Sequence, residues 1–178
     1  NKNLRRTWAD IARFNTGELD MESLSSIIST HETGLSFIAA PTFPDEGDYL
    51  SGDTLSSAIS ILKENFQYVV MDLPHDFSPF ALSGLDAADA ILLVSTPDMA
   101  SVRATAAALD AYSKLAYPRE KIKPVLNATF PRSSLSKEKI ESAMGMSFVA
   151  TMPYVSETVL EAINLGCPLV LDKPKENI

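Results

Sequence analysis

The chain has 178 residues, of which 46% are hydrophobic and 21% are charged, a composition typical of one compact domain with a substantial core. Its formal net charge of −8 repels phosphodiester backbones and disfavours direct binding to nucleic acid. A single cysteine excludes an internal disulfide, and no apolar run is long enough to be an integral membrane segment. We therefore expect a single domain over residues 1–178, located in the cytoplasm.

The first part of the chain predicts three helices and one short strand. Apolar residues recur there at helical spacing, and one compact apolar run ends at a proline. The predicted elements, in chain order, are a helix containing Leu4 to Ala12, a turn at Gly17, a helix capped by Asp20, a strand over 35–40, a loop over 42–53 and a helix containing Leu55 to Leu62.

In the rest of the chain, short apolar runs alternate with helical patterns, which indicates βαβ units and a parallel sheet. Residues 68–73 and 90–95 are apolar nearly throughout, as strands are when helices cover both faces of a sheet. Ser78 and Thr96, each followed by proline, are the expected caps of the next helices. Further elements are predicted as a helix over 99–115, a strand over 122–126, a helix over 136–144, a strand over 148–152 and a helix over 156–165. The predicted fold is α/β, a three-layer sandwich with a mostly parallel sheet.

Asp72 is the most informative residue, because it ends an apolar strand and is followed by Leu73, Pro74 and a polar loop. Ligands of open α/β sheets bind beyond the carboxyl ends of the strands. A carboxylate there can hold Mg²⁺, directly or through water, because this cation prefers oxygen ligands and bridges nucleotide phosphates. The alternative is that Asp72 caps the following turn, and position alone does not decide between the two.

The run Tyr68-Val-Val-Met-Asp-Leu-Pro74 resembles the Walker B segment of the MinD/ParA family of deviant Walker ATPases. Upstream, the run from His31 to Pro41 is similar to the strand before the Walker B helix in the pilus-assembly branch, the CpaE/TadZ proteins. Four later segments resemble family motifs in the same order: Leu93-Val-Ser-Thr-Pro-Asp98, Val125-Leu-Asn127, Met152-Pro153 and the run from Val159 to Pro168. The resemblance covers nearly the whole chain and implies a P-loop NTPase-like fold.

The resemblance also implies roles for five residues. Asp72, followed by Pro74, would belong to the water shell of Mg²⁺, and Asn127, Met152 and Pro153 would contact the adenine of ATP. An asparagine amide offers the donor and the acceptor that an adenine edge needs. The alternative for Asn127 is a turn residue at the end of a strand.

No phosphate-binding loop occurs in the 178 residues, neither G-x-x-x-x-G-K-[ST] nor the deviant K-G-G-x-x-K-T form. Charge on the γ-phosphate then has no stabiliser, so this chain alone has no catalytic residues and should not hydrolyse ATP. In the family, the strand that carries the loop and the next acidic strand precede this region within the sheet. We therefore expect the C-terminal part of a longer protein, incomplete at its N-terminus, with gaps beside the Asp72 strand. The other explanation is a lineage that has lost the loop.

Two functions remain open. The first is an ATP-dependent dimerisation switch that acts in positioning or in pilus or secretion-system assembly, with protein partners from that machinery that recruit it to the membrane or the pole. The second is a non-catalytic scaffold or localisation module of the same fold. A small-molecule enzyme ranks last, because no nucleophile and base are visible. A homodimer is expected, since open sheet edges associate, and no metal is expected at His31 or His75, which lack ligand spacing.

Overall fold

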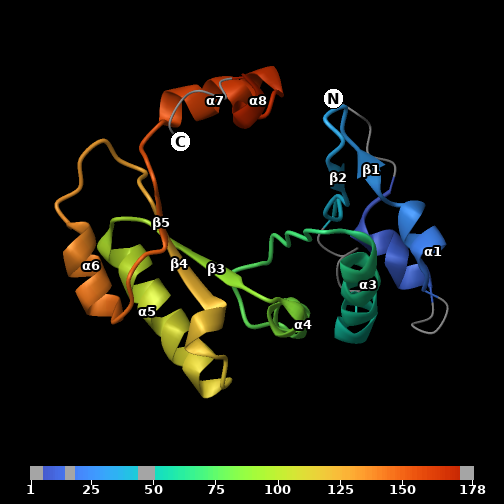
Figure 1. The fold of residues 1–178 in the computed structure, drawn as a ribbon, viewed down its shortest axis with the longest axis horizontal. Coiled ribbons are helices and arrows are strands. Elements are labelled where there is room, and N and C mark those ends of the chain that lie inside the picture. Colours follow the sequence, from blue (N-terminus) through green and yellow to red (C-terminus); the bar gives the residue numbers. More distant parts are fainter. Residues whose placement is uncertain (1–5, 15–18, 44–50, 173–178) are drawn as a thin grey trace. The chain divides into compact units, whose positions relative to one another are not determined.

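The computed structural model describes residues 6–14, 19–43 and 51–172. They form two compact units, one up to Ala88 and one from Asp89 onward, so the single domain stays a prediction. The elements of the first unit are η1 (Trp8–Arg13), α1 (Met21–Ser25), β1 (Ser29–Thr30), β2 (Ser36–Phe37), α3 (Gly52–Asn65) and α4 (Pro79–Ala87). Those of the second are β3 (Ile91–Ser95), α5 (Met99–Lys114), η3 (Arg119–Lys121), β4 (Ile122–Asn127), α6 (Lys137–Met144), β5 (Ala150–Met152), α7 (Ser156–Leu165) and α8 (Leu169–Asp172) (Figure 1).

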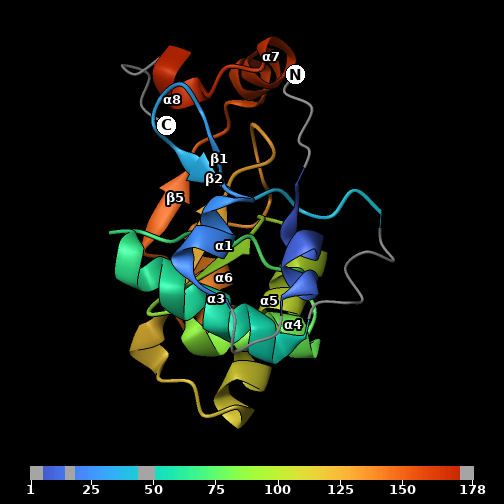
Figure 2. The same cartoon turned by 90° about the vertical axis from the view of Figure 1, so that its right-hand side faces the viewer.

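The first unit packs α1 beside α3 (Figure 2), with a buried apolar core between its elements. The buried core residues are Ile11, Leu24, Ile27, Ala58 and Leu62. Burial of each of these isoleucine and leucine side chains contributes about 1.5–3 kcal/mol. The core therefore holds the helices of this unit together.

The first two predicted helices are shorter than expected. The segment Trp8–Arg13 is a 3₁₀-helix, and Thr7 and Asp10 form a capping box at its N-terminus. Leu4 and Gly17 lie outside the described residues. Asp20 is confirmed as an N-cap, because its carboxylate accepts a hydrogen bond from the Ser23 amide. The apolar spacing alone did not show that the second helix would end at Ser25.

The predicted strand over 35–40 is reduced to β2. It pairs antiparallel with β1, with Ser29 opposite Phe37. An isolated parallel bridge joins Thr7 to Ala39, where the Trp8 amide donates to the Ala39 carbonyl at 3.0 Å. The helix expected from Leu55 to Leu62 is confirmed within α3.

The strand predicted over 68–73 is not formed. Residues 68–74 lie in neither a helix nor a strand, and in the described part of the chain no strand pairs with them. Val69 packs on the core, whereas Tyr68 is 82% and Val70 is 91% exposed. A strand needs a hydrogen-bonding neighbour, which an apolar sequence cannot supply by itself.

The second unit contains a three-stranded parallel sheet in the order β3-β4-β5, so the predicted α/β fold with a parallel sheet is confirmed. Helices α5 and α6 lie on the same side of the sheet (Figure 1). They cover one face through a buried cluster of Val102, Leu126, Ile140, Met144 and Phe148. Both helices connect neighbouring strands in the same direction, and right-handed crossovers then place them on one face.

The other face of this sheet is exposed. Leu92 is 65%, Val94 is 57% and Met152 is 40% exposed. Parallel sheets are normally covered on both faces, so this apolar surface is unusual. No helix among the described residues is long and apolar enough to cross a membrane.

The helix caps of the second unit differ from the prediction at one position. The N-cap of α5 is Asp98 and not Thr96, because the Asp98 carboxylate accepts from the Ser101 amide at 2.9 Å. The Thr96 hydroxyl instead donates to Asp98. The predicted stop of α7 at Gly166 is confirmed by a left-handed φ of 65°.

Candidate functional site

Asp72 lies near the end of segment 68–74, which is neither helix nor strand, two residues before Pro74, and it is exposed. It makes no hydrogen bond or ion pair with any other residue in the described ranges. The first unit holds both Asp72 and Pro74. An exposed carboxylate without a protein partner has its oxygens available for a cation or for cation-bound water.

The loop that follows is fixed to the start of α4. Asp76 accepts hydrogen bonds from the amide and the hydroxyl of Ser78, at 3.0 and 2.7 Å. The Ser78 hydroxyl oxygen in turn accepts from the Ala81 amide and caps α4. The hydrogen bonds from Ser78 lower the pKa of the Asp76 carboxyl, and the nearby His75 adds to this effect. The loop and the helix are thus joined by consecutive hydrogen bonds.

A cavity of about 770 Å³ in the first unit runs along residues 68–74. The rest of its lining is apolar apart from Ser36 and consists of Trp8, Ile28, residues 35–38, Ala40, Pro41, Leu55, Ile59, Leu62, Phe66 and Phe80. Small-molecule sites combine an apolar lining with several convergent polar groups. Asp72 is the one charged side chain among the described residues that line this cavity, so its walls resemble an uncovered core more than a ligand pocket.

The second unit brings together the three residues predicted to contact adenine. Asn127 lies opposite Met152 in the register of β4 and β5, and the Ala128 amide donates to the Met152 carbonyl at 3.0 Å. Pro153 follows directly in the chain. The side-chain amide of Asn127 is half-buried and bonds to no other residue that the structure describes. Its donor and acceptor are therefore available to a ligand at the carboxyl ends of these strands.

Ser95, a polar residue at the carboxyl end of β3, was not singled out from the sequence. Ser95 is 1% exposed, and its hydroxyl lies 3.3 Å from that of Ser101. The Ser101 hydroxyl oxygen also accepts from the Thr96 amide at 2.8 Å. The hydrogen bonds from Thr96 and Ser101 lower the pKa of the Asp98 carboxyl. These groups satisfy one another and form a structural cap, which the serine three residues after Asp98 could have indicated.

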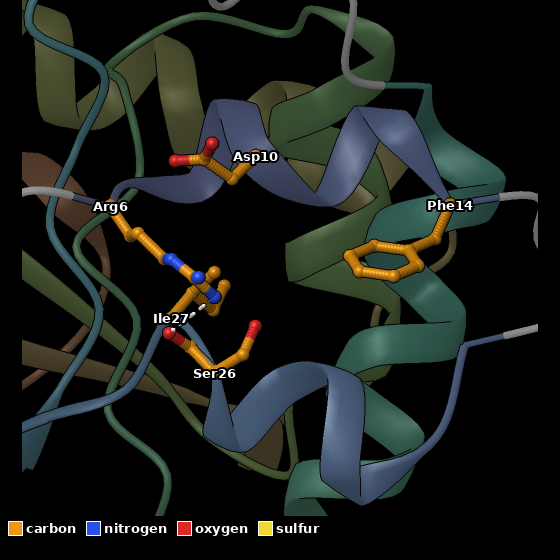
Figure 3. Close-up of a pocket in the computed structure, with 5 residues that line it drawn as sticks. All are labelled: Arg6, Asp10, Phe14, Ser26 and Ile27. Carbon is orange, nitrogen blue, oxygen red and sulfur yellow. Dashed lines mark hydrogen bonds between the residues drawn. The ribbon is translucent and has the colours of Figure 1, made fainter.

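A smaller pocket of about 230 Å³ is lined by Arg6, Asp10, Phe14, Ser26 and Ile27 (Figure 3). The Arg6 guanidinium donates to the Ser26 carbonyl at 3.1 Å, and the Asp10 carboxylate accepts from the Thr7 amide. Both charged groups thus bond to backbone groups of the first unit, and we assign the pocket no function. No group of three or more potential metal ligands occurs among the described residues.

No protein-family profile matches the chain. The septum site-determining protein MinD of Thermotoga maritima is 21% identical over 130 residues, which are 70% of this chain and 48% of that protein. The chain thus spans about half the length of this curated relative.

Solved structures match over nearly the whole chain. A ParA family ATPase from Chlorobium tepidum superimposes with a TM-score of 0.89 at 20% identity, over 99% of this chain and 72% of that one. MinD complexed with Mg-ADP from Pyrococcus horikoshii gives 0.77 at 18% identity, over 98% and 69%. The chain has the MinD/ParA-like ATPase fold, an α/β fold with a parallel sheet, and is related in sequence to MinD.

Proposed function

We propose that the chain is the C-terminal part of a MinD/ParA-type ATPase that acts as an ATP-dependent dimerisation switch. The observation that carries this proposal is the exposed carboxylate of Asp72, which has no partner among the described residues and follows an apolar segment, in a chain with the MinD/ParA-like fold. A relative of this fold was solved with Mg-ADP. The phosphate-binding loop would be supplied by a preceding segment of the natural protein.

The residues present fit ATP and Mg²⁺ in two respects. The carboxylate of Asp72 can orient a water molecule of the Mg²⁺ shell, because its oxygens have no partner among the described residues. The amide of Asn127 can pair with an adenine edge, while Met152 and Pro153 add apolar contact. Bound Mg²⁺ would neutralise charge on the phosphates.

Self-association is supported by exposed apolar side chains in each unit. Tyr68 and Val70 are 82% and 91% exposed in the first unit, and Leu92 is 65% exposed in the second. Isolated exposed apolar residues are ordinary, but unpaired and uncovered strand-like segments favour association. The proposed role is positioning or pilus or secretion-system assembly, of the CpaE-like kind, with protein partners that recruit the dimer.

The same exposed surfaces favour one alternative, a scaffold that binds partners without nucleotide. It predicts the same self-association but no effect of ATP. Nucleotide binding therefore separates the two functions.

The test uses the protein isolated from its natural source. Its intact mass is compared with the 19.3 kDa of the 178 residues, and calorimetry measures ATP binding with and without Mg²⁺. Asp72→Ala should weaken Mg²⁺-dependent binding about 10–100-fold, the usual loss when an outer-shell ligand is removed. Glu64→Ala, an exposed carboxylate on α3, is the control and should change nothing. A mass near 19.3 kDa together with no ATP binding would contradict the ATPase function and leave the scaffold as the function.

A further inference from the structure

Helix α4 approaches the Asp72 segment at a glycine. Gly84 is buried, and a Cβ placed on it would lie 2.7 Å from Cδ2 and 2.9 Å from Cδ1 of Leu73. Carbon atoms that are not bonded to each other pack at about 3.5–4.0 Å. No side chain fits at residue 84 unless Leu73 or α4 moves.

Leu73 follows Asp72 directly, so its packing acts on the backbone that carries the carboxylate. No ladder hydrogen bonds hold residues 67–74 to another strand in the part of the chain that the structure describes. The position of Asp72 therefore depends on the packing of neighbouring side chains such as Val69 and Leu73. A displacement of Leu73 is not resisted by a sheet.

Helix α4 is also held on its α3 side, so it cannot easily retreat from Leu73. A Cβ on Gly52, the first residue of α3, would lie 2.5 Å from the Ser83 hydroxyl oxygen and 3.4 Å from the Pro79 carbonyl. At the other end of α4, the Lys63 ammonium donates to the Ala87 carbonyl at 3.0 Å. A methyl group at residue 84 would consequently push on Leu73 rather than shift the whole helix.

We propose that Gly84 is a positioning residue, whose missing side chain lets α4 pack on Leu73 and thereby fixes the carboxylate of Asp72. The expected effect of Gly84 on Mg²⁺ binding rests on the proposed function. Its effect on the position of Asp72 does not. Gly84 itself contacts neither metal nor nucleotide. Its effect passes through Leu73.

The experiment compares three variants of the natural protein. Gly84→Ala introduces the clash, and Gly52→Ala is the matched control, because it disturbs α4 at Ser83 without reaching Leu73. The double variant Gly84→Ala with Leu73→Val adds a carbon at residue 84 and removes one at residue 73, so it should restore the fit. Backbone amide resonances of Asp72 and Leu73 report their position by NMR. Mg²⁺ titration of ATP binding reports the function.

Gly84→Ala should shift the Asp72 and Leu73 amides and raise the Mg²⁺ concentration for half-maximal ATP binding about tenfold, since small misplacements of a site are costly. In Gly52→Ala, the Mg²⁺ concentration for half-maximal ATP binding should stay within about twofold of the value for the natural protein. In the double variant, it should return to within about threefold of that value. Equal effects of the two glycine variants, or no recovery in the double variant, would overturn the inference.

The two proposals fail in different ways. If Asp72→Ala leaves Mg²⁺-dependent binding unchanged, the proposed function fails. The NMR data still decide the positioning role in that case, because unshifted Asp72 and Leu73 amides in Gly84→Ala would contradict it. If the amides shift, Asp72→Ala weakens binding and Gly84→Ala does not, the positioning role is rejected.

Discussion

Asn127 and Met152 lie opposite each other at the carboxyl ends of two neighbouring parallel strands. The register of β4 and β5 therefore places an amide that bonds to no other described residue beside a flexible apolar side chain that is 40% exposed. Such a pair can hydrogen-bond to one edge of a planar base and contact its face. Their roles in nucleotide binding stay a prediction that mutation can test.

The first prediction concerns Asn127. Asn127→Ala should weaken ATP binding by the natural protein about 3–10-fold, because a hydrogen bond contributes about 0.5–1.5 kcal/mol net. Asn127→Asp keeps the shape but loses the donor, so it should weaken ATP binding as well. Calorimetry with ATP and GTP provides the measurement. Unchanged preference for ATP over GTP in both variants would remove Asn127 from the adenine site.

The second prediction concerns the end of α5, where Ala116 has a left-handed φ of 59°. The Tyr117 amide donates to the Tyr112 carbonyl and the Ala116 amide donates to the Ser113 carbonyl, which is a Schellman motif with alanine at the glycine position. Ala116→Gly should therefore raise the free energy of unfolding by about 0.5–1 kcal/mol. Urea denaturation measures this change.

A matched control for Ala116 lies within the same helix. Ala107 is exposed in the middle of α5, so Ala107→Gly should lower the free energy of unfolding by about 1 kcal/mol. If both glycine variants are destabilised equally, the left-handed turn at Ala116 is not strained.

The third prediction concerns acid stability through Asp98. Hydrogen bonds from the Thr96 hydroxyl and the Ser101 amide lower the pKa of this carboxyl in the folded state. Its contribution to stability is therefore complete above the unfolded pKa of about 3.9 and is lost as the pH falls through the lower folded pKa. Asp98→Ala should reduce the melting temperature at pH 7 and flatten its dependence on pH below 4.

Asp98→Asn separates the cap from the charge. Asparagine caps helices as well as aspartate does, so this variant should keep most of the stability at pH 7 while losing the acid dependence. An unchanged acid limb in Asp98→Asn would show that other carboxylates control it.

The fourth prediction compares a buried and an exposed isoleucine of the second unit. Ile140 of α6 is 1% exposed, and Ile163 of α7 is 68% exposed. Ile140→Ala should lower the free energy of unfolding by about 2–4 kcal/mol, and Ile163→Ala by less than about 0.5 kcal/mol. Equal losses would mean that α7 is covered in solution by something else.

Most elements of the second unit could be predicted from the sequence, because their information is local. The apolar run at β3 and the helical spacing of α5 are strong signals over whole segments, and the run at β4 is a weaker one. The prediction that Thr96 is the N-cap of α5 was wrong, because Asp98 lies two residues later and can cap the same helix. The carboxylate prevails since it accepts from the Ser101 amide and lies at the positive end of the helix.

The candidate site residues stay predictions. The rule that ligands bind at strand ends singled out Asp72, and the resemblance to MinD/ParA proteins singled out Asn127. Strand pairing is a tertiary property, so neither the missing ladder of residues 67–74 nor the register of Asn127 with Met152 could be derived from local pattern. The close contact of Gly84 with Leu73 could not be foreseen either, because it joins two segments through packing alone.

We propose that the bound nucleotide controls whether the protein self-associates. The most direct measurement is light scattering of the natural protein during size exclusion, in ATP with Mg²⁺, in ADP with Mg²⁺ and without nucleotide. We expect a dimer in ATP with Mg²⁺, a monomer in ADP, and loss of the ATP-dependent dimer in Asp72→Ala. One and the same mass under all three conditions would contradict it.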